Sequence, residues 1–180
     1  PYLHLPVQSG SDKILKNMNR KYTAKEYIEI IELLRKRRPD IALSSDFIVG
    51  FPGETKSDFR QTINLVKEVG FAQAYSFKYS KRTGTKAVRM NDLVSDQEAS
   101  DRLQELQQIL GLQKKSFNKK FINKNVEVIV KGKGKKNDQY RGTTKWMQSV
   151  NFNIAGEIKS EYNLKILNAS QSSLLGEVTS

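Results

Sequence analysis

The spacing of apolar residues changes once along the chain, near residue 116, and this change limits the folds that the chain can adopt. Before it, apolar stripes with helical spacing alternate with short apolar runs of strand length. After it, apolar residues recur at every second position in short segments separated by Gly, Asn, Lys and Ser. The first pattern is typical of parallel α/β units, and the second of small β-barrels. We therefore predict an α/β domain at residues 1–116 and an all-β barrel at residues 117–180.

Capping signals predict two helices in the first domain. Thr23 and Glu26 occupy the N-cap and N3 positions of one helix, and Thr55 and Asp58 those of the next. In a capping box these side chains satisfy the free backbone amides of the first turn. The apolar positions expected to be buried are Tyr27, Ile30, Ile31 and Leu34 in the first helix and Phe59, Ile63 and Val66 in the second.

Three strands are predicted beside these helices. The middle strand is apolar enough to be buried on both faces of a parallel sheet. The alternating order predicts right-handed crossovers, and three parallel strands are too few for a closed barrel. We therefore expect the C-terminal half of a partial (β/α) barrel, with further strands before Pro1, where the sequence opens without an initiator Met. The strands are expected at residues 1–7, 41–49 and 71–79, with Phe71, Tyr75, Phe77 and Tyr79 on one side of the third.

A long helix and five short strands are predicted in the rest of the chain. Ser95 and Glu98 mark the start of the helix, and we place the domain boundary near Ser116. The number and spacing of the strands favour a small five-stranded barrel. The apolar stripe of the helix comprises Leu103, Leu106, Leu110, Phe117 and Phe121, and the strands are expected at 125–134, 139–144, 149–153, 162–167 and 173–178.

Glycines and polar groups follow each predicted strand of the α/β domain. In "GFPGETKS", Gly50 and Gly53 permit a tight turn into the next helix. The spacing excludes a P-loop, which requires four residues between its glycines. Chain reversal alone explains such a turn, but ligands of parallel α/β folds gather at the C-terminal strand ends. Because "QSGS" and "YSKRTG" end the neighbouring strands, the three ends together suggest a shared binding floor.

His4 is the single histidine of the chain and lies inside the first predicted strand. The sequence suggests neither a Ser-His-Asp arrangement nor a set of metal ligands around it. We therefore predict that His4 packs in the core.

The charge of the chain favours a polyanionic partner. Lys and Arg number 31 against 19 Asp and Glu, which gives a net charge of +12 and points to nucleic acid. Many of the cations lie between residues 119 and 145, where Tyr140 and Trp146 can stack on bases. A solvated basic surface is the alternative, but a cationic, glycine-containing loop on a small barrel favours RNA binding. The predicted RNA-binding residues are Lys131, Lys133, Lys135, Lys136, Arg141, Lys145 and Trp146.

Neither a membrane span nor a signal peptide is predicted. No apolar run approaches the roughly 20 residues that cross a bilayer, and the N-terminus lacks the charged, apolar and small-residue regions of a secretory signal. We expect a cytoplasmic, monomeric protein without membrane contact.

Three ordered motifs carry a resemblance to a known family: "HLPVQSGSDKILKNMNRKYT", "SSDFIVGFPGETKSDFRQTI" and "YSFKYSKRTGTKA". They resemble the second half of the radical S-adenosylmethionine domain of bacterial tRNA methylthiotransferases, of the methylthio-dimethylallyladenosine synthase type. Residues from about 119 to 178, ending in "NASQSSLLGEV", resemble the TRAM module that follows that domain, although "QYRGTT" stands where the family tends to have Gly-Arg-Thr.

The resemblance implies a reaction, a cofactor and a partner. The reaction is insertion of a methylthio group at carbon 2 of a prenylated adenosine next to the anticodon, so the implied partner is the anticodon stem-loop of tRNA. Arg20 is a candidate partner for the cofactor carboxylate, because a guanidinium binds a carboxylate through two hydrogen bonds. The residues implied to face S-adenosylmethionine are Gln8, Ser9, Gly10, Arg20, Asp46, Ile48 and Gly50.

The resemblance also implies 4Fe-4S clusters held by cysteines, and the chain has no cysteine. We therefore expect the 180 residues to be inactive alone and to be a fragment of an enzyme that carries the cluster ligands elsewhere. The alternative is a truncated, catalytically dead product that acts only as a tRNA- or RNA-binding protein. A sugar- or phosphate-binding barrel enzyme would explain the glycines but not the basic barrel.

Overall fold

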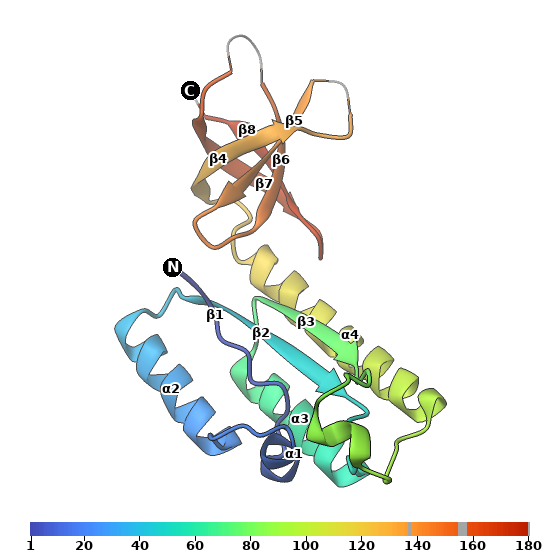
Figure 1. Cartoon of the computed structure of the whole chain (residues 1–180). Helices are drawn as coiled ribbons and strands as arrows, with labels where there is room; N and C mark the ends of the chain where they lie inside the picture. The colour runs from blue at the N-terminus through green and yellow to red at the C-terminus, as the bar shows by residue number, and fades with distance from the viewer. Residues whose placement is uncertain (137, 155–157, 180) are drawn as a thin grey trace. The chain divides into compact units, whose positions relative to one another are not determined.

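The computed structural model describes residues 1–136, 138–154 and 158–179 (Figure 1). The chain forms two compact units. One is Leu3–Leu110, and the other is Gly111–Ser180 together with Pro1–Tyr2. No helix in the described part of the chain is long and apolar enough to cross a membrane.

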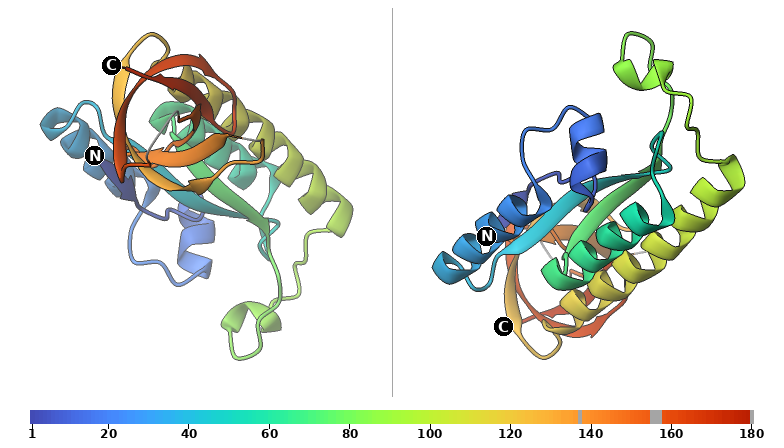
Figure 2. Two further views of the ribbon diagram at one scale, coloured as in Figure 1. Left: turned by 90° about the horizontal axis from the view of Figure 1, so that it is seen from above. Right: turned by 90° about the horizontal axis from the view of Figure 1, so that it is seen from below.

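The first unit is an α/β structure around a three-stranded sheet. Its strands lie in the order β1-β2-β3, and β2 and β3 are parallel. In Figure 2, α3 and α4 lie side by side along the sheet. The elements are β1 (Tyr2–His4), α1 (Asp12–Asn17), α2 (Ala24–Arg37), β2 (Ala42–Val49), α3 (Lys56–Val69), β3 (Gln73–Lys78), the 3₁₀ turn η1 (Lys86–Arg89) and α4 (Asp96–Lys119).

The predicted helix starts are confirmed. Thr23 and Glu26 form a reciprocal capping box before α2, and Thr55 and Asp58 form one before α3. The hydroxyl of Ser95 accepts a hydrogen bond from the amide of Glu98 at the start of α4, at 3.2 Å. α3 is followed by Gly70, a C-cap in the left-handed conformation that favours glycine.

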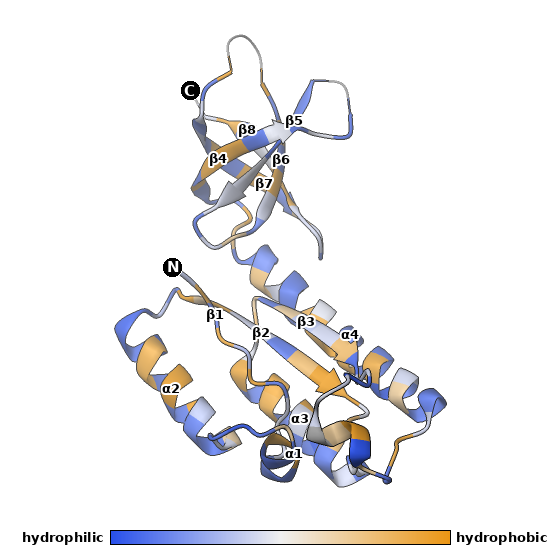
Figure 3. Ribbon diagram, viewed as in Figure 1, coloured by the Kyte–Doolittle hydropathy of each residue, from blue (hydrophilic) through white to orange (hydrophobic). Residues whose placement is uncertain are grey.

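One core joins the three long helices to one face of the sheet. Phe47 and Val49 of β2 are fully buried, and Phe71 packs edge-on against Phe47 at 5.5 Å between ring centroids. Ile31 of α2 is buried, but the predicted burial of Ile30 is wrong because the apolar stripe is narrower than the spacing suggested. The other core residues from the helices include Tyr27, Phe59, Ile63, Val66, Leu106 and Leu110, and Figure 3 shows the apolar residues of these elements in orange.

The opposite face of the sheet is open, which corrects the prediction that β2 is buried on both faces. Asp46 and Ile48 lie on this face and are only partly buried. In the β2–β3 register they stand opposite Tyr75 and Phe77, which are 47% and 55% exposed. The aromatic residues of the third strand therefore do not share one side, because Phe71 belongs to the core and these two rings do not.

The second unit is a closed five-stranded barrel in the order β4-β5-β6-β8-β7, which confirms the predicted barrel. Gly142 makes the β4–β5 contact possible, because a Cβ there would lie 2.3 Å from Cγ1 of Val128 and 2.7 Å from the carbonyl oxygen of Ile129. Val128, Val150, Phe152, Leu164 and Ile166 fill its core. The strands are β4 (Asn125–Lys133), β5 (Gln139–Thr144), β6 (Ser149–Asn153), β7 (Glu161–Ala169) and β8 (Leu174–Val178).

Asp58 joins the N-termini of α1 and α3. Its Oδ2 accepts hydrogen bonds from the amide and hydroxyl of Thr55, at 2.9 and 2.7 Å, and its Oδ1 accepts one from the hydroxyl of Ser11 at 2.7 Å. Lys13 adds an ion pair at 3.2 Å. Burial opposes ionisation of Asp58, but these hydrogen bonds outweigh it and hold the pKa of the carboxyl well below its ordinary value of 3.8.

We expect Asp58→Asn to lower the free energy of unfolding by about 2 kcal/mol at pH 7, because hydrogen bonds to an ionised group are lost. The native carboxyl contributes this stability above its ordinary pKa of 3.8. The contribution is lost as the pH falls from about 4 through the lower pKa of the folded state. Urea denaturation of both proteins between pH 7 and pH 2 should therefore show converging stabilities, and a difference that is constant over this range would contradict the assignment.

Candidate functional site

The turn after β2 is built from two glycines and a buried carboxylate. Gly50 and Gly53 have φ values of +70° and +80°, in the region that side chains rarely adopt. The Gly50 amide donates a hydrogen bond to Oε1 of Glu54 at 3.0 Å. A Cβ on Gly50 would lie 2.6 Å from the Cβ of Ala99 in α4. Both glycines are therefore explained by the tight turn and its packing on α4.

Arg102 of α4 holds this turn in place. Its Nη1 donates to the backbone oxygen of Glu54 at 3.0 Å and to Oε1 of the same residue at 2.5 Å, and its Nη2 donates to Glu98 at 2.6 Å. Arg102 and Glu54 are each about 5% exposed. Burial raises the pKa of Glu54 above its ordinary value, against the opposing effects of the Gly50 amide and Arg102. The guanidinium is thus the charge that favours an ionised carboxylate in this buried position.

His4 lies on the open face of the sheet, so the prediction of a core histidine is wrong. Its Nδ1 lies 3.0 Å from the hydroxyl of Ser44, its Nε2 lies 3.5 Å from Oδ2 of Asp46, and its ring meets that of Tyr75 edge-on at 6.1 Å. A Ser-His-Asp contact therefore exists, contrary to expectation. Ser44 is fully buried, which makes it unsuitable as a nucleophile, and the contacts instead orient His4 and Asp46.

The alternation of residue types could have placed His4 correctly. Leu3 and Leu5 pack against the core, so residues 2 and 4 must point to the other face of an extended strand. The partners Ser44 and Asp46 obey the same rule in β2. No local signal could show that this face is open.

The residues predicted at the other strand ends have different environments. The backbone of Gln8 pairs with β2. Its backbone N–H donates to the backbone carbonyl oxygen of Asp46, and its backbone carbonyl oxygen accepts from the backbone N–H of Ile48, both at 2.9 Å. Ser9 is fully buried beside Thr62 of α3. Gly10 packs so closely on α3 that a Cβ would lie 2.5 Å from the oxygen of residue 61. Arg20 is exposed after α1.

The open face offers groups that suit a small polar ligand with an aromatic ring. Asp46 supplies carboxylate oxygens that can accept hydrogen bonds from hydroxyls, while Ile48 and Phe77 supply apolar surface. Among the described residues, no group of three or more His, Cys, Asp or Glu side chains is arranged to hold a metal ion.

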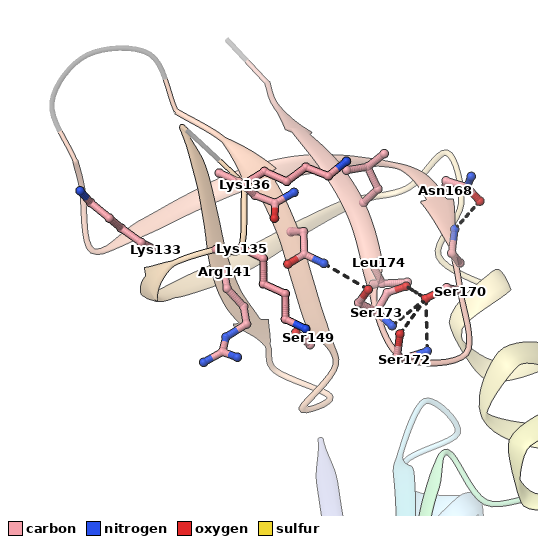
Figure 4. A pocket seen from close by; sticks show the side chains of 15 residues that line it. Lys133, Lys135, Lys136, Arg141, Ser149, Asn168, Ser170, Ser172, Ser173 and Leu174 are labelled. Carbon is pink, nitrogen blue, oxygen red and sulfur yellow. Dashed lines mark hydrogen bonds between the residues drawn. The ribbon is translucent and has the colours of Figure 1, made fainter.

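A cleft of about 700 Å³ opens on the outside of the barrel unit (Figure 4). The β4–β5 hairpin and β5 contribute its cations, and none of the described residues that line it is acidic. In Figure 4, Lys135 and Lys136 extend toward the serine-rich side of the cleft, whereas Lys133 points away from it. The charged lining residues are Lys133, Lys135, Lys136 and Arg141, and the polar ones include Ser149, Asn151, Asn168, Ser170, Ser172 and Ser173.

The other three predicted RNA-binding residues, Lys131, Lys145 and Trp146, lie outside this cleft lining. Trp146 packs against Phe121 at 4.8 Å between ring centroids, and the Lys145 ammonium lies 4.7 Å from the Trp146 ring. Tyr140 packs partly against the barrel core. The structure thus brings four of the seven predicted residues together around one cleft. Composition did not indicate the neutral serine and asparagine side of this cleft.

Part of the chain matches a protein-family model, and almost all of it is similar to particular relatives. Residues 1–66 match the model of the Radical SAM superfamily. Almost the whole chain is similar to proteins named tRNA-2-methylthio-N(6)-dimethylallyladenosine synthase. The identity is 52% for that of Ehrlichia canis, 49% for that of Wolbachia pipientis wMel and 47% for that of Novosphingobium aromaticivorans.

These alignments cover 98–99% of this chain and 40–41% of each relative. The chain thus spans about two fifths of the length of the curated relatives that it matches. The predicted resemblance to the tRNA methylthiotransferases is confirmed.

We expect Arg102→Met to lower the free energy of unfolding by about 3 to 5 kcal/mol, because it leaves the Glu54 carboxyl buried without its cation. The double variant with Arg102→Met and Glu54→Gln should lose less stability than the sum of the losses of the two single variants. Gln at position 54 carries no charge that needs the Arg102 cation. Chemical denaturation of the three variants measures this coupling.

Arg60→Met is the matched control, because Arg60 pairs with Glu105 on the surface, where the side chains are 61% and 37% exposed. This change should cost less than about 1 kcal/mol. Equal losses for Arg60→Met and Arg102→Met would show that the buried pair does not hold the turn.

Proposed function

We propose that this chain is the C-terminal part of a radical S-adenosylmethionine tRNA methylthiotransferase. The observation that supports this most strongly is similarity to synthases of that name over 98–99% of the chain, at 47–52% identity. The proposed reaction adds a methylthio group at carbon 2 of a prenylated adenosine next to the anticodon. Residues 1–116 would be the C-terminal half of a partial (β/α) barrel, and residues 117–180 a TRAM barrel of the OB-like type.

The open sheet face is the proposed wall of the S-adenosylmethionine site. The bound cofactor supplies a sulfonium bond whose reductive cleavage begins the radical chemistry. Asp46 would accept hydrogen bonds from ribose hydroxyls, and Ile48 and Phe77 would cover the base with apolar surface. The contact between His4 and Asp46, at 3.5 Å, supports this role because it orients the carboxylate.

The strand ends around this face would complete the cofactor site. The backbone bridge of Gln8 to β2 brings the first strand end beside Asp46 and Ile48. The backbone around Ser9, Gly10 and Gly50, rather than buried side chains, would approach the ligand. Arg20 is exposed and remains the proposed partner of the cofactor carboxylate.

The residues of this chain do not fit a 4Fe-4S cluster. Protein ligands of such clusters are typically cysteine thiolates, and the sequence has none. We therefore propose that the cluster ligands come from residues outside these 180, and that the chain is inactive without them. The proposed setting is a cytoplasmic, monomeric enzyme that acts on tRNA.

The native polypeptide should have a mass well above that of 180 residues, because the curated relatives are more than twice as long as this chain. Intact mass and N-terminal sequencing of the protein from its source cells measure this directly. A native chain that begins at Pro1 would contradict the enzyme proposal and support a catalytically dead RNA-binding product instead.

Lys135→Ala combined with Lys136→Ala should weaken binding to an anticodon stem-loop, because both side chains extend into the cleft. The logarithm of the affinity falls linearly with the logarithm of the salt concentration. Loss of two cations should make this slope shallower by about 1.4, at roughly 0.7 for each lost contact with single-stranded RNA. Fluorescence anisotropy between 50 and 300 mM salt checks this.

Lys25→Ala combined with Lys67→Ala removes the same charge from exposed positions of the α/β unit. This control should leave the salt dependence nearly unchanged. Equal effects of the two double variants would indicate a dependence on net charge alone and would contradict a specific role for the cleft.

A further inference from the structure

The barrel cleft has two chemically different walls. One carries the cations of the β4–β5 hairpin and β5, and the other carries neutral side chains of β6, β8 and the 170–173 turn (Figure 4). Phosphate binding requires only the first wall. The second wall offers amide and hydroxyl groups beside apolar surface from Leu174 and Leu175. This combination suits a group that has hydrogen-bonding edges and an apolar face.

Strand pairing places three unlike side chains in one row across the barrel surface. Arg141 of β5 is opposite Asn151 of β6, which in turn is opposite Leu175 of β8. Residues paired in this way share a face of the sheet and lie about 5 Å apart. Leu175 is 44% exposed. A nucleotide presents the matching groups, namely a phosphate, a base edge and an apolar ring face.

Hydrogen bonds fix the 170–173 turn of the neutral wall. The Ser170 hydroxyl accepts hydrogen bonds from the amides of Ser172 and Ser173 at 3.2 and 3.0 Å. Asn118 is 2% exposed. Its side chain donates to the backbone carbonyl oxygen of Ser170 at 2.9 Å and accepts from the side-chain amide of Gln148 at 2.9 Å. A wall ordered before binding loses little conformational entropy when a ligand arrives. Non-specific attraction between charges does not require ordered neutral groups of this kind.

Asn151 is the residue of this wall best placed to contact a base. Its Nδ2 donates to the Ser173 hydroxyl at 3.1 Å, which orients the amide group. A side-chain amide carries a second N–H donor and a carbonyl acceptor. These are complementary to the hydrogen-bonding edge of an unpaired base.

We infer that the cleft reads one base of a single-stranded RNA segment, with Asn151 on the base edge and Leu175 against the base face. Lys135 and Lys136 hold the adjoining phosphates. This inference rests on the proposed function, which supplies RNA as the partner. It adds that the barrel contributes base preference as well as charge.

The test uses the 180-residue chain and fluorescent eight-nucleotide RNAs that are identical except for the base at one position. The unaltered chain should prefer one base there. Asn151→Ala should weaken binding of the preferred RNA about tenfold, the size of one good base contact, and should weaken the other RNAs much less. Its salt dependence should not change, because no cation is removed.

Asn153→Ala is the matched control, since Asn153 lies two residues along β6 and outside the cleft lining. It should leave the base preference intact, and thermal unfolding should show that both variants remain folded. Equal losses for all RNAs with Asn151→Ala, or the same effect from Asn153→Ala, would overturn the inference.

Two further results separate this inference from the proposed function. Salt-sensitive binding without base preference would overturn base reading but leave tRNA as the partner. No binding to any RNA would contradict the RNA partner and therefore the inference with it. Competition by polyglutamate as effective as that by RNA would indicate an acidic protein partner and would also overturn the inference.

Discussion

The buried ion pair between Arg102 and Glu54 is the interaction on which the α/β unit most depends. The Glu54 carboxylate accepts a hydrogen bond from the Gly50 amide. Arg102 donates to both the carboxylate and the backbone oxygen of Glu54. One guanidinium thus connects α4 to the turn at the end of β2. Removal of either partner would leave an unpaired charge at a position that is about 5% exposed, which costs much stability. The ion pair therefore favours one arrangement of the turn and of the adjoining sheet face.

The two units offer surfaces with opposite chemistry. The sheet face combines the Asp46 carboxylate with exposed aromatic rings, which suits a ligand with hydroxyls and a planar base and disfavours a bare phosphate. The barrel cleft is lined by cations and neutral amides, with no acidic residue among its described lining, which suits a polyanion. We therefore propose a cofactor site on the first unit and an RNA site on the second.

Local signals made much of this structure predictable. The capping residues at 23, 26, 55 and 58 determine helix starts through contacts within four residues, and the alternating pattern of the five barrel strands depends only on their own sequence. The environments of His4, Ile30 and Tyr75 were not predicted, because exposure depends on what other elements cover. The neutral wall at Asn151 was missed for a related reason, since uncharged residues carry no compositional signal and the strand register is set by the folded barrel.

We propose that cofactor and RNA are bound by separate surfaces of this chain. Amide chemical shifts of the ¹⁵N-labelled chain, recorded while an anticodon stem-loop RNA is added, can distinguish the two surfaces. We predict that the largest shifts fall on the cleft residues between 133 and 175, while the amides of Asp46 and Ile48 change little. Shifts concentrated on β2 and the turn at residues 50–54, with the barrel unaffected, would contradict it.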